Sequence, residues 1–322
     1  MDNRIFMLVL DVNIHHKNRH ALTQYHRHFH VDIVDFANFE SAIAQRKHSV
    51  LFSPAVPIHV HRLPDNIKLC IFGPHFSVFP EEDILAPLFA ASAMAATTAA
   101  IYVQPSDWAR MAWVRHPLFL APRAITLETL PFGVDTHKFQ PAQQLPPSPP
   151  DQRVFVYLKR RLHAEFAFAL QFLQSINIHD AVIFDVTLGY NEEDYLACLR
   201  AAKFGLWIGS HESQGFALLE CLSCNVPLLL WDATSMAQEI GGNHPHVPAT
   251  SAPYWDARCG EKFTDKHQLA DAYHTLAQNI DNHAYSPRQF VLDNVGVDVC
   301  EERLKRLVHT YTCTDASDHS RC

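Results

Sequence analysis

The sequence predicts an α/β protein with two domains in series, each a parallel sheet covered by helices. Short apolar runs alternate with longer helical segments in both halves of the chain, a pattern that is typical of parallel sheets. A proline-rich stretch separates the two halves. With 322 residues, the chain is long enough to form two domains of ordinary size.

In the first half, the run from Arg4 to Val12 predicts a buried strand, and the segment from His16 to Phe29 predicts a helix. The segment from Leu85 to Val103 has membrane-spanning length and carries no charge. Ala and Thr dominate this segment, so we expect a buried helix followed by a strand. The other predicted strands lie within 31–36, 49–54, 68–73, 100–106 and 125–134.

Five prolines between Pro141 and Pro150 prevent a helix and predict an extended connector. We therefore expect an N-terminal domain at 1–142, a linker at 143–153 and a second domain at 154–290, followed by a helical segment at 291–322. The second half is predicted to contain strands within 154–159, 181–189, 204–210 and 227–232, and helices within 163–176, 191–203, 215–224, 265–280 and 299–311.

The composition describes a globular protein, with 48% hydrophobic and 19% charged residues. A net charge of -8 argues against a protein that coats nucleic acid. Eight scattered cysteines and an opening without a signal-peptide cleavage pattern predict reduced thiols in the cytoplasm. Contact with a membrane is conceivable but not indicated.

Several common nucleotide and metal motifs are missing or weak. The first glycine is Gly73, so no Gly-x-Gly-x-x-Gly follows the first strand, and no Walker loop is present. This argues against a dehydrogenase or a phosphate-loop ATPase. Cys221 and Cys224 form a C-x-x-C inside a helical run, and His16 and His20 are four apart among 22 histidines. We expect neither pair to hold a metal.

The candidate site is the stretch IGSHESQGFALLECLSCNVPLLLWD, from Ile208 to Asp232. Its turn follows a predicted strand, where ligands of open α/β sheets bind. We expect Ser213 to cap the next helix and Gly215 to permit close approach of a ligand, with the helix amides receiving a diphosphate. Glu220, in an otherwise apolar run, needs hydrogen-bond donors, and ribose hydroxyls would supply two.

The simpler alternative is that these glutamates have no ligand. In that interpretation Glu220 lies at an exposed helix corner, and Glu212 belongs to an ordinary surface loop.

The Glu-x7-Glu spacing of Glu212 and Glu220, with SQGFALL between them and CNVPLLLWD after them, resembles the retaining glycosyltransferases of the GT-B fold. LPFGVDTHKFQP, from Leu130 to Pro141, is similar to the segment that closes their first domain, and YSPRQFVLDNV to their closing helices. The resemblance is weak over residues 1–70. It implies two Rossmann-like domains facing an interdomain cleft, with the last helix crossing back to the first domain.

The resemblance also implies a role for each residue that matches its motif. Glu220 would bind the ribose of a nucleotide-sugar donor, and Glu212 would contact the transferred sugar. The remaining donor-binding residues would be Arg160, Ser213, Gln214, Gly215, Phe216 and Ala217.

The diphosphate of the donor needs cations, because charge develops on it as it leaves. The family places an Arg and a Lys after a glycine here, whereas this chain has VYLKRRLHAEF. Tyr157 replaces the glycine and the downstream lysine is missing. We assign the role to Lys159 and Arg161, the alternative being a solvated charge run. A helix amino end with these cations would make a metal unnecessary.

In the first half, His75 follows a predicted strand and is a candidate to contact the donor sugar or the acceptor hydroxyl. An ordinary loop histidine is the equal alternative. Ser106 and Trp108 lie after another predicted strand, where an aromatic face could stack on a sugar, although packing is the more frequent use of tryptophan.

The sequence therefore predicts a metal-independent retaining glycosyltransferase that moves a hexose from a UDP- or GDP-linked donor to a glycan, lipid or protein hydroxyl. One alternative is a non-catalytic protein that binds a nucleotide sugar or a glycan, which the altered VYLKRR segment favours. Another is an enzyme that glycosylates DNA bases, which the acidic net charge disfavours.

Overall fold

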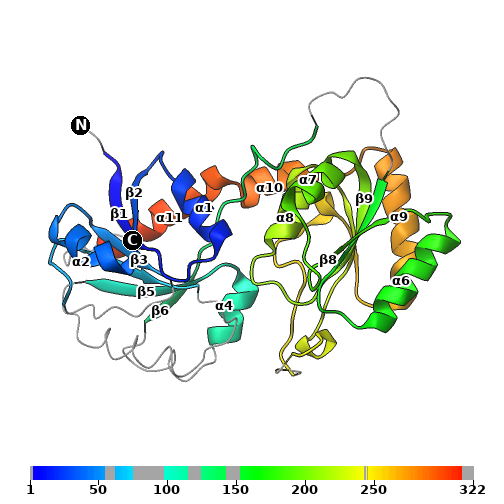
Figure 1. Ribbon diagram of the computed structural model, residues 1–322, viewed down its shortest axis with the longest axis horizontal. Helices are drawn as coiled ribbons and strands as arrows, with labels where there is room; N and C mark the ends of the chain where they lie inside the picture. Colours follow the sequence, from blue (N-terminus) through cyan, green and yellow to red (C-terminus); the bar gives the residue numbers. More distant parts are fainter. Residues whose placement is uncertain are drawn as a thin grey trace, which may run out of the picture. The chain divides into compact units, whose positions relative to one another are not determined.

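The computed structural model describes residues 3–54, 62–74, 98–114, 125–142, 153–242, 244 and 246–313 (Figure 1). The chain divides into two compact units. Unit 1 consists of Met1–Gly133 and Val297–Cys322, and unit 2 of Val134–Gly296. Residues 143–152 of the predicted proline-rich linker lie outside the described residues. Residues 85–97 of the uncharged segment from Leu85 to Val103 lie outside them as well.

Unit 1 contains a six-stranded sheet in the order β2-β1-β3-β4-β5-β6, and every neighbouring pair is parallel. The strands are β1 (Ile5–Leu10), β2 (Phe29–Val34), β3 (Val50–Ser53), β4 (Leu69–Phe72), β5 (Ala99–Gln104) and β6 (Thr126–Thr129). The helices are α1 (His16–Gln24), α2 (Phe36–Ala44), α4 (Asp107–Val114) and α11 (Val297–Thr312).

The strands of unit 1 fall within the predicted runs or overlap them. The first predicted helix is shorter than expected, because α1 ends at Gln24 and Phe29 already begins β2. The apolar run before Phe29 therefore belongs partly to the sheet. The helices α2 and α4 were not predicted.

Helix α11 belongs to unit 1 although it follows unit 2 in the sequence. It buries Cys300, Leu304 and Val308. The carboxylate of Glu301, also buried, accepts the backbone N–H of His28 at 2.6 Å. The chain thus returns to complete its first unit.

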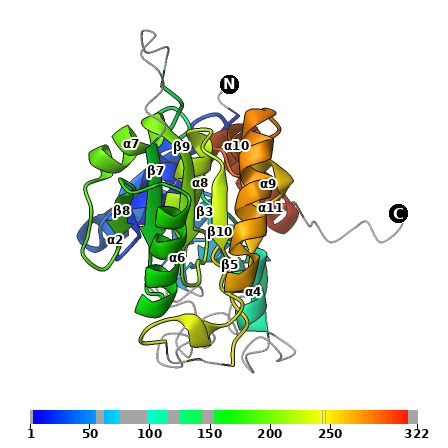
Figure 2. The same ribbon diagram turned by 90° about the vertical axis from the view of Figure 1, so that its right-hand side faces the viewer.

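Unit 2 contains a five-stranded parallel sheet in the order β11-β10-β9-β7-β8. The strands are β7 (Arg153–Leu158), β8 (Val182–Asp185), β9 (Ala202–Ile208), β10 (Leu228–Trp231) and β11 (Gly260–Phe263). The helices are α6 (His163–Ser175), α7 (Glu192–Ala201), α8 (Phe216–Ser223), α9 (Leu269–Asp281) and α10 (Pro287–Asn294). Figure 2 shows the strands of this sheet with helices around it.

Side chains of β7 alternate between two cores, as the period of a strand requires. Val156 and Leu158 join the core that includes buried residues of α6 and α9. Phe155 and Tyr157 point the other way, where both rings contact Tyr195 of α7. The sheet is therefore covered on both faces.

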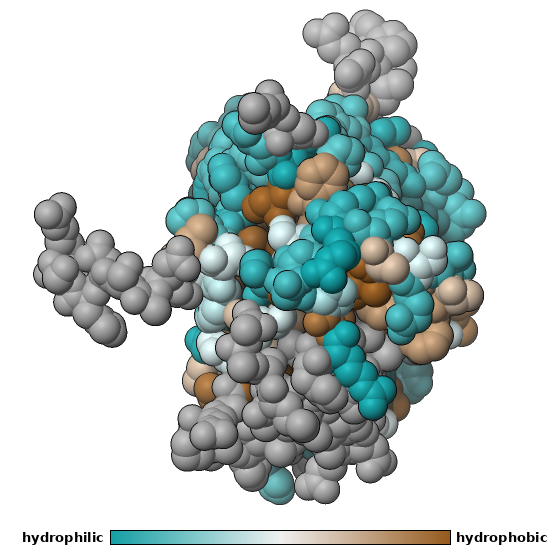
Figure 3. Space-filling model, turned by 90° about the vertical axis from the view of Figure 1, so that its left-hand side faces the viewer, coloured by the Kyte–Doolittle hydropathy of each residue, from teal (hydrophilic) through white to brown (hydrophobic). Residues whose placement is uncertain are grey.

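Hydrophilic side chains cover most of the surface that the described residues present in Figure 3, and hydrophobic ones gather in small areas. No helix in the described part of the chain combines the length and the apolarity needed to span a bilayer.

Candidate functional site

The strand order of unit 2 places a topological switch point between β7 and β9. Counting strands in chain order, the sheet reads 5-4-3-1-2, the arrangement in which ligands bind beyond the carboxyl ends of the first and third strands. The segment after β7 begins with Lys159, and the segment after β9 leads to Glu212. Two regions of the sequence that were predicted separately as site segments thus meet here.

The side chains of Lys159 and Glu212 form an ion pair across this switch point. Lys159 Nζ lies 2.8 Å from Glu212 Oε1. The two backbones are joined as well, since Ser210 N–H donates to the carbonyl of Lys159 at 2.9 Å and Lys159 N–H donates to that of Ile208 at 3.0 Å. The side chains are largely buried, with 25% of Lys159 and 12% of Glu212 exposed.

Gly215, not Ser213, is the N-cap of α8, and no side chain caps the helix from that position. Gly215 has φ +80°, a left-handed conformation that other residues rarely adopt, which explains the glycine. The prediction of Ser213 as the cap was wrong. Serine and glycine are both common N-cap residues, so the sequence alone did not separate Ser213 from Gly215. Phe216 and Ala217 form the first turn, whose N–H groups point away from the helix, and Gln214 before it is buried.

Glu220 is the fifth residue of α8 and is 4% exposed. It therefore does not lie at an exposed corner, which excludes the alternative interpretation for this residue. Burial raises the pKa of Tyr157 above its usual range, and the charges of Glu212 and Glu220 raise it further. Tyr157 is hydrogen-bonded to Tyr190, whose pKa burial and Glu220 also raise. The charges of both glutamates thus act on Tyr157 and Tyr190.

Arg161 lies inside unit 2, with a side chain that is 0% exposed. Its Nε and a terminal nitrogen donate to the two carboxylate oxygens of Glu165 at 2.8 and 2.9 Å. Its other terminal nitrogen donates to the carbonyls of Gly209 and Trp231 at 3.0 and 3.3 Å. The guanidinium also lies over the Trp231 ring. Arg161 therefore fastens the ends of β9 and β10 to the start of α6.

The predicted contact of Arg161 with a diphosphate stays a prediction. The guanidinium already uses four hydrogen bonds within the protein, so a phosphate would have to replace some of them. The arrangement makes Arg161 a residue that holds the carboxyl edge of the sheet in place.

A second group of charges surrounds Glu239, a residue that the sequence analysis missed. Arg160 donates to Glu239 at 2.8 Å, and His211 Nδ1 hydrogen-bonds to its other oxygen. Burial by itself raises the pKa of Glu239, but the bond from His211 and the charges of His211, Arg160 and Lys159 lower it below the usual value. The sequence did not predict this contact, because Glu239 follows β10 and is far along the chain from Arg160.

Two buried polar atoms at the end of β9 were also missed. Trp207 Nε1 and Ser210 Oγ have no hydrogen-bond partner among the described residues, and Trp207 stacks on Tyr157 with ring centroids 3.8 Å apart. Unsatisfied buried polar atoms cost free energy. They are unsatisfied polar groups beside the carboxyl end of β9, next to the candidate site.

The three candidate site residues from the first half of the chain add little evidence for a ligand site. His75 lies outside the described residues. Ser106 is buried, and its hydroxyl accepts the N–H of Ala109 at 3.2 Å at the start of α4. Trp108 belongs to the first turn of α4. Ser106 thus has a structural use as a helix cap.

No protein-family model matches the chain, and no curated protein matches its sequence. Solved structures do match it. A glycosyltransferase from Rickettsia africae aligns with a TM-score of 0.65 at 9% identity, covering 98% of this chain and 100% of that one. Sucrose-phosphate synthase from Thermosynechococcus elongatus gives 0.56 at 13% identity, covering 95% and 99%.

A third similar structure is an alpha-glucosyltransferase in complex with UDP-glucose and DNA containing an abasic site. It has a TM-score of 0.57 at 10% identity and covers 95% of this chain and 99% of that chain. At identities this low, the structural similarity shows a shared fold and nothing more. The two parallel α/β units and the near-complete coverage establish that the chain has the GT-B fold.

Proposed function

We propose that this protein is a retaining glycosyltransferase that moves a sugar, with a hexose as the expected group, from a nucleoside diphosphate to an acceptor hydroxyl. The observation that carries the proposal is the pairing of Lys159 with Glu212 at the switch point of unit 2. It occurs in a GT-B fold, and the similar solved structures named above include two glycosyltransferases.

The donor diphosphate would lie at the amino end of α8, near Lys159. Helix amino ends favour anions because their N–H groups and dipole point outward. A phosphate oxygen that binds Lys159 would release Glu212 from its ion pair. The Glu212 carboxylate could then accept hydrogen bonds from hydroxyls of the transferred sugar, and Glu220 those of the ribose.

In this proposal the leaving diphosphate, stabilised by Lys159 and the helix amides, also takes the proton of the acceptor hydroxyl. That route needs no enzyme nucleophile and keeps the configuration of the sugar. We further propose that the reaction is metal-independent, uses a UDP- or GDP-linked donor and occurs in the cytoplasm. Ser210, whose buried hydroxyl has no hydrogen-bond partner among the described residues, would contact the donor, and His75 would contact the donor sugar or the acceptor hydroxyl.

The proposal is tested by incubating the full chain with a panel of UDP- and GDP-sugars, with EDTA present, and measuring nucleotide release. We expect one donor to be consumed and to raise the melting temperature by mass action. Replacing Glu212 with Gln should lower the rate by about 100-fold. The matched control is Glu40→Gln on the exposed surface of α2. Wild-type rates in Glu212→Gln would refute the site assignment.

A non-catalytic binding protein is the second candidate, because Lys159 and Arg161 are both already paired with carboxylates. It predicts saturable donor binding without any nucleotide release over long incubation. The third candidate is an enzyme that glycosylates DNA, which the DNA complex of the similar alpha-glucosyltransferase makes worth testing. A net charge of -8 weighs against it, and failure to bind duplex DNA at low salt would exclude it.

A further inference from the structure

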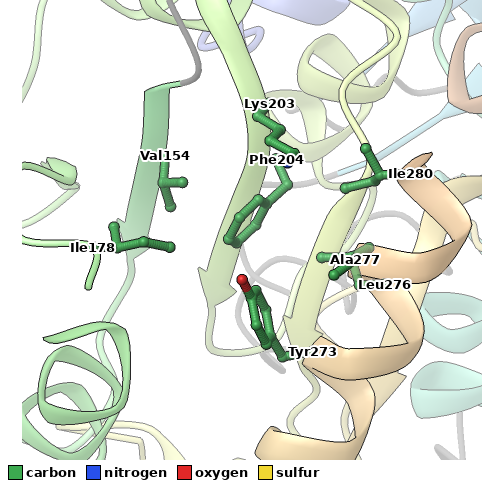
Figure 4. A pocket seen from close by; sticks show the side chains of 8 residues that line it. All are labelled: Val154, Ile178, Lys203, Phe204, Tyr273, Leu276, Ala277 and Ile280. Atoms are coloured by element: carbon green, nitrogen blue, oxygen red, sulfur yellow. The ribbon is translucent and has the colours of Figure 1, made fainter. Parts of the chain in front are cut away.

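Unit 2 contains a cavity of about 180 Å³ at the edge of the sheet opposite to Lys159 and Glu212 (Figure 4). Val154 is the second residue of β7 and Lys203 the second residue of β9, and both line the cavity. Because these strands are parallel, the cavity lies at their amino ends. It is therefore separate from the candidate donor site.

The lining of the cavity is apolar except for two side chains. Six of its eight residues have wholly hydrocarbon side chains, and the other two are Lys203 and Tyr273. In Figure 4 the Tyr273 hydroxyl points toward Phe204, between the strands and α9. Neither the ammonium of Lys203 nor that hydroxyl has a hydrogen-bond or ion-pair partner in the described part of the chain.

The volume limits what this cavity can hold. An apolar protein cavity of about 150 Å³ stays dry and binds benzene, so the present volume suits one six-membered ring with a small substituent. A ring between Phe204, Leu276 and Ala277 would remove apolar side-chain surface from water.

The two polar side chains of the lining indicate which ligand charge the cavity favours. A lysine ammonium forms charge-assisted hydrogen bonds with carboxylates, which are stronger than neutral ones. No acidic side chain lines the cavity in the part of the chain that the structure describes, so a cationic ligand would meet Lys203 without compensation. The Tyr273 hydroxyl offers a further donor.

We propose that this cavity binds a small carboxylic acid with a single ring, the carboxylate on Lys203 and the ring among the apolar side chains of β9 and α9. The site is independent of glycosyl transfer.

The test is calorimetric titration of the full chain with benzoate and, separately, with benzylamine, which has the same ring and the opposite charge. Benzoate should bind saturably, and benzylamine at least about tenfold more weakly. Lys203→Met, which keeps the aliphatic stem, should weaken benzoate about tenfold. Lys68→Met, at an exposed position in unit 1, should bind it as the wild type does.

A second variant, Ala277→Leu, should abolish benzoate binding by filling the space. Thermal melting checks that both variants are folded. If Ala277→Leu does not fold, Lys203→Met decides alone. Absence of saturable benzoate binding overturns the proposal, and so does binding of equal strength in wild type and Lys203→Met. Because no sugar donor is used, neither result bears on the proposed transferase activity.

Discussion

Lys159 and Glu212 neutralise each other at the carboxyl edge of the second sheet, with 2.8 Å between Nζ and Oε1. One residue follows β7 and the other follows β9, the two strands that flank the switch point. A partly buried pair of this kind keeps a cation available for an anionic ligand without leaving its charge uncompensated. The pair therefore suits a site that must accept and release a diphosphate.

Replacing Lys159 with Met should weaken UDP or GDP binding about tenfold, because a charge-assisted bond to phosphate is lost. The measurement is calorimetric titration of the nucleotide that best stabilises the wild type. Lys68→Met, on the surface of unit 1, is the control and should bind normally. Unchanged affinity in Lys159→Met would show that the diphosphate lies elsewhere.

Replacing Arg161 with Met should destabilise the protein by about 3 kcal/mol, because Glu165 loses its partner in a buried pair. Two backbone carbonyls, of Gly209 and Trp231, also lose their donor. The free energy of unfolding in urea measures this loss. Arg306→Met, exposed on α11, should leave it nearly unchanged.

The double variant Arg161→Met/Glu165→Met tests whether the loss in the free energy of unfolding comes from breaking the ion pair. It should recover part of the loss, since replacing both charges removes the uncompensated carboxylate. If Arg161 instead serves the diphosphate, as the family resemblance implies, Arg161→Met alone should unfold at the wild-type urea concentration and fail to bind UDP.

The strands and the general place of the site were predictable from the sequence. Buried parallel strands are continuous apolar runs, so stretches such as that of β9 stand out. The burial of Glu220 followed from its apolar helical neighbours. The short strand β11 was missed because GEKF carries two charged residues among four and has no apolar run.

The partners of the charged residues were not predictable. Lys159, Arg160 and Arg161 are consecutive, and the sequence does not indicate which one turns inward. Arg160 has φ +50°, a local backbone feature that directs the three side chains to different partners. Glu239 lies far along the chain, and only the fold brings it to Arg160.

Buried cysteines should be unreactive in the native protein. Burial raises the pKa of Cys224, Cys259 and Cys300 to about 12, so almost no thiolate forms at pH 8. Ellman's reagent should therefore label the exposed Cys313 rapidly and these three only after unfolding in urea. Rapid labelling of any thiol in a Cys313→Ser/Cys322→Ser variant would contradict the burial.

The last prediction concerns the acid stability of unit 2. The pKa of Glu239 is lowered from 4.5, because the hydrogen bond from His211 and the nearby positive charges outweigh the effect of burial. A carboxylate with a lowered folded-state pKa stabilises the protein fully above its unfolded-state value. This contribution is lost as the pH falls through the lowered pKa.

Glu239→Gln should thus lower the free energy of unfolding at pH 7 and flatten its decline below pH 4.5, where the wild type loses the contribution of the carboxylate. The measurement is urea unfolding at a series of pH values. Glu40→Gln on α2, exposed to solvent, should keep the wild-type slope. Equal acid slopes in Glu239→Gln and wild type would mean that His211 and Arg160 do not hold this carboxylate in its charged form, because only a lowered pKa makes the two curves diverge.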